Sequence, residues 1–198
     1  MLADLAYNNK DYDLAIATYG SLIEITGNPA TKLHAQVHRL RSAWTVTDYE
    51  LLAQETAAVL ANSKLAPETA TELRYYRAKA YLNQGKDEGA IEDLRILAKD
   101  TRNVYGAEAK YQLAQIYYNI RQYDHAEKEV LDYISVSTPH SYWLARSFVL
   151  LADVYMKNEK YIEAKQYLIS LKQSYQAKDN IAAMIDERLK NLENMMNN

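Results

Sequence analysis

The sequence predicts an all-α protein in which about five helix-turn-helix repeats stack into a superhelix, followed by one capping helix. Three observations predict this fold class. An alanine recurs every 36 to 38 residues, small and aromatic residues hold set positions before it, and glycine and proline are rare. Five glycines and three prolines are too few for a protein of many strands and tight turns. The recurring alanines are Ala15, Ala53, Ala90, Ala126 and Ala164.

Two further columns accompany this alanine column. A small residue lies twelve positions upstream in four repeats, at Ala3, Ala78, Ala114 and Ala152, with Arg41 as the exception. Nine positions upstream lie Ala6, Trp44, Tyr81, Tyr117 and Tyr155. Two antiparallel helices approach closely only where a small side chain leaves space for a large one from the neighbour. The columns therefore predict the contact between the two helices of each repeat.

The same columns set the elements in chain order. The repeats are expected at residues 1–28, 29–64, 65–102, 103–138 and 139–177. First helices are expected near 31–46, 67–84, 105–120 and 141–158, and second helices near 11–26, 48–62, 87–100, 123–136 and 161–176. Only two residues precede Ala3, so we expect the first helix of the first repeat to be cut short. We interpret residues 1–198 as a single solenoid domain, truncated at its N-terminus from a longer chain.

Local signals mark several of these boundaries. Pro67 and Pro139 suit the first turn of a helix, and Thr138 is a natural N-cap before Pro139. The stretch Thr47 to Glu50 resembles a capping box that opens a second helix. Gly85 is expected at the tight turn inside its repeat.

The C-terminal segment, residues 179–195, predicts a capping helix. Its apolar residues fall on one helical face, at Ile181, Met184, Ile185, Leu189 and Leu192. The end of a solenoid needs a polar outer surface to stay in solution, and a helix with one apolar face supplies it.

Composition argues against several classes of function. The net charge of −3 comes from 23 basic and 26 acidic residues with no run of Lys and Arg, so nucleic-acid binding is not expected. There is no cysteine for a disulfide, a zinc ribbon or thiol catalysis, and no apolar run approaches the ~18 residues of a membrane span. We find no catalytic motif and expect no cofactor and no enzymatic activity.

His34 and His38 are the residues that most resemble a metal-binding pair. Their i, i+4 spacing could present two nitrogens to one metal ion. The residues between them are Ala35, Gln36 and Val37, so the glutamate of a zinc hydrolase helix is missing and no third ligand is evident. We therefore expect ordinary histidines and no metal site.

The columns resemble the tetratricopeptide repeat, whose pattern of small, aromatic, Ala and large apolar residues crosses a helix pair. The fit is good around Ala90, Ala126 and Ala164, fair in the first repeat, and poor around Ala53. The stretches Tyr105 to Ala114, Tyr123 to Lys128 and Ser141 to Arg146 are similar to the repeats of bacterial cell-envelope proteins. These include the Tol-Pal accessory protein, the lipoprotein of the outer-membrane assembly machine, and the C-terminal region of large Bacteroides-type repeat proteins.

The resemblance implies a right-handed superhelix whose first helices line a concave groove that binds a partner peptide or helix. In the predicted register, the groove residues are His38, Ser42, Thr45, Tyr75, Lys79, Leu82, Asn83, Tyr111, Gln115, Tyr118, Asn119, Val149, Asp153 and Met156. An equally weighted interpretation places Tyr111 and Tyr118 in the packing between repeats. Lys79 has few basic companions, so a clamp for a C-terminal carboxylate is not expected.

The leading hypothesis is a protein-binding scaffold of the bacterial cell envelope or periplasm. The alternative is a cytoplasmic regulatory module of a signalling or transcription protein, and a third possibility is a repeat domain attached to an enzyme. The residues leave open the identity of the partner, the compartment and the oligomeric state.

Overall fold

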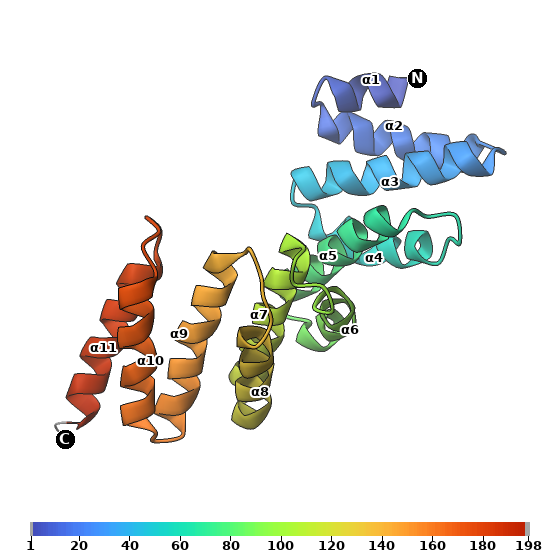
Figure 1. Ribbon diagram of the computed structural model, residues 1–198. Coiled ribbons are helices and arrows are strands. Elements are labelled where there is room, and N and C mark those ends of the chain that lie inside the picture. Colours follow the sequence, from blue (N-terminus) through green and yellow to red (C-terminus); the bar gives the residue numbers. More distant parts are fainter. Residues whose placement is uncertain (1, 197–198) are drawn as a thin grey trace. The chain divides into compact units, whose positions relative to one another are not determined.

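The computed structural model describes residues 2–196, which form eleven helices and no strand. Consecutive helices from α1 to α5, and again from α7 to α11, lie side by side (Figure 1). The chain divides into two compact units, residues 1–93 and 94–198. The helices are α1 (Leu2–Asn8), α2 (Tyr12–Ile25), α3 (Pro29–Thr45), α4 (Tyr49–Leu60), α5 (Pro67–Asn83), α6 (Asp87–Leu97), α7 (Val104–Asn119), α8 (Tyr123–Ile134), α9 (Ser141–Lys157), α10 (Tyr161–Ser174) and α11 (Ile181–Met196).

The predicted all-α fold is confirmed, and every expected helix forms within about three residues of its expected ends. Helix α1 is short: it contains seven residues, whereas α3 contains 17. The interpretation of residues 1–198 as one domain stays a prediction.

All five turns between the first and second helices of a repeat share one geometry. One residue in each has a positive φ, at Lys10, Thr47, Gly85, Arg121 and Glu159. The next N–H donates back to a carbonyl five residues earlier, as from Gln122 to Tyr117 at 2.8 Å and from Asp48 to Ala43 at 2.8 Å. This bond ends a helix in a Schellman motif, in which a left-handed residue closes the last turn. Gly85 is the one glycine among these five left-handed residues, and its position in the tight turn agrees with the prediction.

The turns show that the predicted register of the second repeat was wrong by one residue. Spacing from Lys10 to Thr47 to Gly85 places Leu52, not Ala53, opposite the alanines of the other repeats. Leu52 is fully buried like Ala15 and Ala90, whereas Ala53 is partly exposed. Leu40 likewise takes the place given to Arg41, and Ala43 that of Trp44. The second repeat therefore uses two leucines where the others use two alanines.

Two predicted helix caps also need correction, while one is confirmed. Pro67 opens α5 as expected. At α4 the cap is Asp48, whose carboxylate accepts the Leu51 N–H at 3.0 Å, because Thr47 is occupied by the left-handed turn. At α9 the helix begins at Ser141, so Pro139 lies outside its first turn. Thr138 instead donates its hydroxyl to the Thr101 carbonyl at 2.8 Å and so ties two loops together.

The core of residues 94–198 explains why the last helix forms. Ile181, Ile185 and Leu192 of α11 are buried in one cluster with Ala152 of α9 and Leu168 of α10. These three side chains lie on one face of α11, whereas Asp186 and Glu187 are exposed. The predicted capping helix thus covers the apolar faces of α9 and α10 and turns charge outward.

Candidate partner-binding surface

In the corrected register, three positions recur in the second half of each of α3, α5, α7 and α9. The first position holds Arg41, Lys79, Gln115 and Asp153, and the second holds Trp44, Leu82, Tyr118 and Met156. The third position holds Thr45, Asn83, Asn119 and Lys157, and these residues are exposed. Residues at the first two positions are half-buried.

Three predicted groove residues turn out to belong to the interior or to its edge. Ser42 is fully buried, and its hydroxyl donates to the His38 carbonyl at 2.8 Å. Val149 is buried in the core of residues 94–198, and Tyr111 is only 5% exposed. These three side chains therefore serve packing between helices more than an open surface.

Sequence reasoning missed Arg41 and Trp44, because the one-residue slip put Ser42 and Thr45 in their places. Arg41 donates to both carboxylate oxygens of Glu72, at 2.7 to 3.2 Å, and joins α3 to α5. Burial alone would raise the pKa of Glu72, but hydrogen bonds from Arg41 and Tyr76 hold that pKa below its ordinary value. The left-handed turn at Thr47 fixes the register of this repeat and identifies both residues.

Aromatic rings cover the rest of this surface on α3 and α5. The Trp44 ring stacks on Tyr76 with centroids 4.4 Å apart and meets Tyr75 edge-on at 5.5 Å. The Lys79 ammonium lies 5.9 Å from the centroid of the Tyr75 ring. Leu82 is half-buried and Asn83 exposed at the end of α5. The result is an aromatic surface with one fixed ion pair.

On α7, a chain of hydrogen bonds links Tyr111, Gln115 and Asn119. The Tyr111 hydroxyl donates to the side-chain oxygen Oε1 of Gln115 at 2.8 Å, and the side-chain Nε2 of Gln115 donates to Oδ1 of Asn119 at 3.0 Å. Arg146 of α9 donates to the Tyr111 oxygen at 2.9 Å, and its guanidinium lies 4.7 Å from the centre of that ring. These hydrogen bonds hold the Gln115 and Asn119 side chains in one orientation.

A pocket of about 190 Å³ opens between α7, α9 and α11. It brings together three predicted residues, Tyr118, Asp153 and Met156. The other lining residues are Lys157, Glu187, Arg188, Asn191 and Met195, four of them on α11. The predictions assigned α11 a capping role alone, so its share of this pocket was not foreseen.

The polar side of this pocket is an ion pair. Arg188 donates through Nε and Nη2 to both oxygens of Asp153, at 2.9 to 3.2 Å. Burial raises the pKa of Asp153 above its ordinary value, although the hydrogen bonds from Arg188 act in the opposite direction. With Tyr118, Met156 and Met195 on the walls, the pocket suits a side chain that is apolar along its length and polar at its tip.

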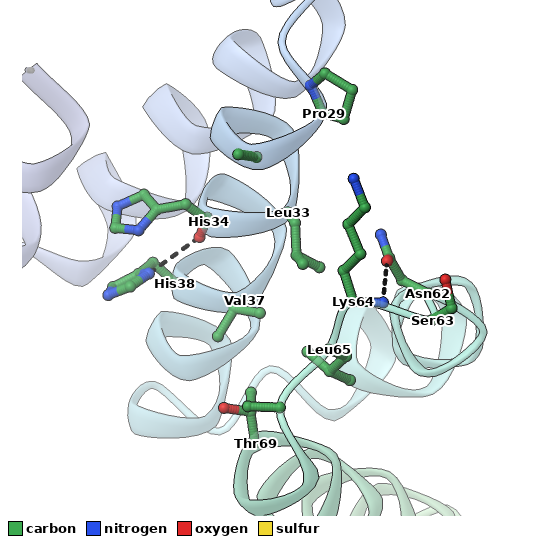
Figure 2. A pocket seen from close by; sticks show the side chains of 12 residues that line it. Pro29, Leu33, His34, Val37, His38, Asn62, Ser63, Lys64, Leu65 and Thr69 are labelled. Carbon is green, nitrogen blue, oxygen red and sulfur yellow. Dashed lines mark hydrogen bonds between the residues drawn. The ribbon is translucent and has the colours of Figure 1, made fainter.

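A second, larger cavity of about 530 Å³ lies among residues 1–93 (Figure 2). Leu33 and Val37 of α3 line it together with Leu65 from the loop before α5. His34 and His38 stand at its edge, where the His38 Nδ1 bonds the His34 carbonyl at 3.0 Å. His38 is the one predicted groove residue in this cavity.

His34 bonds a carboxylate of the neighbouring helix α1. The Nε2 atom of His34 contacts an Asp4 oxygen at 2.8 Å, and the Tyr19 hydroxyl donates to the same oxygen at 2.9 Å. These contacts lower the pKa of Asp4 to about 2, the hydrogen bond with His34 being the largest cause. Within residues 2–196 no three His, Asp or Glu side chains are grouped as metal ligands. The contact between His34 and Asp4 joins α3 to α1.

Family comparison identifies two of the repeats. Residues 107–137 and 145–176 each match the tetratricopeptide repeat. These segments hold most of α7 with α8 and most of α9 with α10, and four residues that line the pocket beside Asp153 lie in them. No curated protein matches the sequence.

Solved structures show the same fold. The C-terminal part of a TPR repeat-containing protein from Cytophaga hutchinsonii aligns with 96% of this chain and 77% of its own, with a TM-score of 0.65 and 18% identity. A second fold of this kind is that of a kinesin light chain-like protein from Podospora anserina, whose TPR-like repeats are nearly identical to one another. It aligns with 87% of this chain and 90% of its own, with a TM-score of 0.56 and 20% identity. The fold is therefore the all-α tetratricopeptide type.

None of the described helices is both long and apolar enough to cross a membrane.

Proposed function

We propose that this chain is a protein-protein interaction scaffold whose main contact surface is the face of α7, α9 and α11 around the pocket beside Asp153. Tetratricopeptide repeats generally mediate contacts between proteins, and two such repeats contribute α7 and α9 to this face. The observation that carries the proposal is the pocket in which Tyr118, Asp153 and Met156 from two repeats meet the residues of α11.

The chemistry of the surface favours a peptide or helix as the bound form. Gln115 and Asn119 offer oriented amides to a backbone, and the adjacent pocket accepts one side chain. Tyr provides a large contact area at a small cost in conformational entropy, and Met provides a flexible side chain of adaptable shape. Our leading proposal for the location of this scaffold is the bacterial cell envelope or periplasm. The alternative is a cytoplasmic regulatory module.

Site-specific photocrosslinking in the native host tests this proposal. A photoreactive amino acid replaces Met156 at the pocket wall, and a matched control replaces Ile162, which is 63% exposed on α10. We expect a discrete protein adduct at position 156, absent at 162, and lost when Tyr118→Ala is added. Cell fractionation of the adduct reports the compartment. Adducts at both positions, or an adduct at 156 that Tyr118→Ala leaves unchanged, would refute binding at this face.

A further inference from the structure

Arg146 of α9 is the one half-buried arginine of residues 2–196 that has no carboxylate partner. The other half-buried arginines each pair with an Asp or Glu at 2.6 to 3.1 Å, and these are Arg39, Arg41, Arg74, Arg77 and Arg188. Taking a charge partly out of water is costly unless an opposite charge compensates it. Arg146 therefore carries a charge that no carboxylate of the described chain balances.

Aromatic side chains surround the Arg146 guanidinium. Its Nη2 donates to the Tyr111 hydroxyl at 2.9 Å, and its Nη1 donates to the Tyr142 hydroxyl at 3.2 Å. The central carbon lies 4.7 Å from the centroid of the Tyr111 ring and 5.9 Å from those of Tyr142 and Trp143. Ring faces attract a cation, but the rings are neutral near pH 7 and cancel none of its charge.

The guanidinium also has hydrogen-bond donors to spare. It carries five N–H groups, and the two phenol contacts use one on each of Nη1 and Nη2. One N–H is therefore left on each of these two nitrogens. A carboxylate, which binds arginine through both of its oxygens, matches this pair of donors. Arg146, Tyr142 and Trp143 are all partly exposed, so a partner can reach the guanidinium.

Arg146 shares a face of α9 with the pocket beside Asp153. The two residues are seven positions apart, which is about two turns of helix or about 10.5 Å. On the adjacent α7 (Figure 1), Tyr111 and Tyr118 have the same spacing. Tyr111 bonds Arg146, and Tyr118 lines the pocket. A peptide that lies along α7 and α9 therefore meets both the guanidinium and the pocket.

The charges of the pocket do not oppose an acidic partner. Two acidic and two basic residues line it, so its charges balance, and these residues are Asp153, Glu187, Lys157 and Arg188. The sign of the charge that this face attracts is therefore decided by Arg146.

We infer that the partner is an acidic peptide whose Asp or Glu side chain binds Arg146 while a second side chain enters the pocket beside Asp153. This inference rests on the proposed scaffold function and adds the charge and the spacing of the partner. An extended chain advances about 3.3 Å per residue, so the acidic residue lies about three positions from the one in the pocket. The rings of Tyr142 and Trp143 favour an apolar residue beside the acidic one.

Selection from a library of displayed random peptides tests the inference on the purified chain. The unmodified chain and Arg146→Glu are screened in parallel. We expect Asp or Glu at one shared position of the peptides that bind the unmodified chain, and Lys or Arg there for Arg146→Glu, because the charge is reversed. Lys128→Glu makes an acidic substitution at an exposed position of α8 and should select the same acidic peptides as the unmodified chain. Circular dichroism checks that each variant is folded.

A double-mutant cycle then measures the contact itself. Replacing the acidic residue of a selected peptide by the corresponding amide should raise the Kd for the unmodified chain by about tenfold or more. The same replacement should change the Kd for Arg146→Gln by less than about twofold, because no charge remains to pair with the acid. Arg146→Lys keeps the charge and should keep the preference for the acidic peptide.

The inference is overturned by selected peptides that share no acidic position, or by an amide that weakens binding to Arg146→Gln as much as to the unmodified chain. Tyr118→Ala separates this failure from failure of the proposed function. Peptides that Tyr118→Ala no longer binds, but that do not depend on Arg146, would leave the pocket as a binding site and exclude only the acidic contact. Peptides that bind Tyr118→Ala and the unmodified chain equally well would exclude the proposed surface and this inference together.

Discussion

At the scale of a single residue, Gly106 shows how closely the backbone of α7 approaches the preceding loop. A Cβ atom added there would overlap the carbonyl oxygen of Asp100 and lie 2.6 Å from that of Leu97. Both obstacles are backbone atoms, which cannot swing aside as a flexible side chain can. The absence of a side chain at Gly106 therefore allows the start of α7 to lie close to the backbone at the end of α6.

Gly106→Ala should lower the free energy of unfolding by about 1 to 3 kcal/mol, as overpacking of a buried site does. Gly27→Ala is the matched control, because no atom lies within 4 Å of its added Cβ and its φ is not positive. That change should be neutral or stabilise by about 0.4 to 1 kcal/mol through the unfolded chain. Urea unfolding followed by circular dichroism measures both. Equal effects of the two substitutions would show that the approach to Asp100 is not tight.

At the scale of an element, α11 is attached to α9 by apolar burial and by one ion pair. Arg188 and Asp153 have about a fifth of their side chains exposed, so the pair is partly desolvated. Arg188→Ala would leave the half-buried Asp153 carboxylate without its partner. Breaking a buried pair in this way costs more than the pair contributes, because the remaining charge is stranded.

We expect Arg188→Ala to destabilise the protein by about 1 to 3 kcal/mol and to increase amide hydrogen exchange in α11 before other helices. Adding Asp153→Asn should restore part of the loss, because the uncharged amide tolerates burial better. Hydrogen exchange with mass spectrometry follows each helix separately. Uniform exchange across residues 94–198, with α11 no faster than α9, would show that the pair does not control the attachment of α11.

Sequence periodicity was sufficient to place all the helices because their ends depend on local signals. Pro67, Gly85 and the apolar face that begins at Ile181 all act within one or two turns of helix. The register of the second repeat required tertiary information. Ala53 stands next to Leu52, and only the position of the left-handed Thr47 shows which of the two faces inward.

The candidate surface was predictable in part for the same reason. In residues 94–198 the register held, and Tyr118, Asp153 and Met156 do share a pocket. On α3 the slip replaced Arg41 and Trp44 by Ser42 and Thr45. The contribution of Arg188 depends on how α11 packs across α9, which no pattern within one repeat encodes.

At the scale of the whole molecule, tyrosine dominates the aromatic content, with 18 tyrosines and one phenylalanine. The pKa values of several tyrosines are raised, with burial as the largest cause in each, and they lie in both compact units. They include Tyr19, Tyr111, Tyr118, Tyr133, Tyr155 and Tyr175. The pKa of Tyr175 rises to about 12. The folded protein therefore keeps phenol protons that the unfolded chain releases near pH ~10.

This difference predicts a steep loss of stability in alkali. A raised folded-state pKa means that the tyrosines contribute their full stability below pH ~10, and that the contribution declines as pH rises from there through the folded-state values. Each tyrosine adds at most about 1.4 kcal/mol per pH unit to the slope. Urea unfolding between about pH 8 and 11.5, with phenolate absorbance recorded in parallel, measures both the slope and the late ionisation. Tyr155→Phe removes one such group and should make the dependence of the unfolding free energy on pH shallower. An unfolding free energy that stays level across this pH range, or a slope that the variant leaves unchanged, would contradict the prediction.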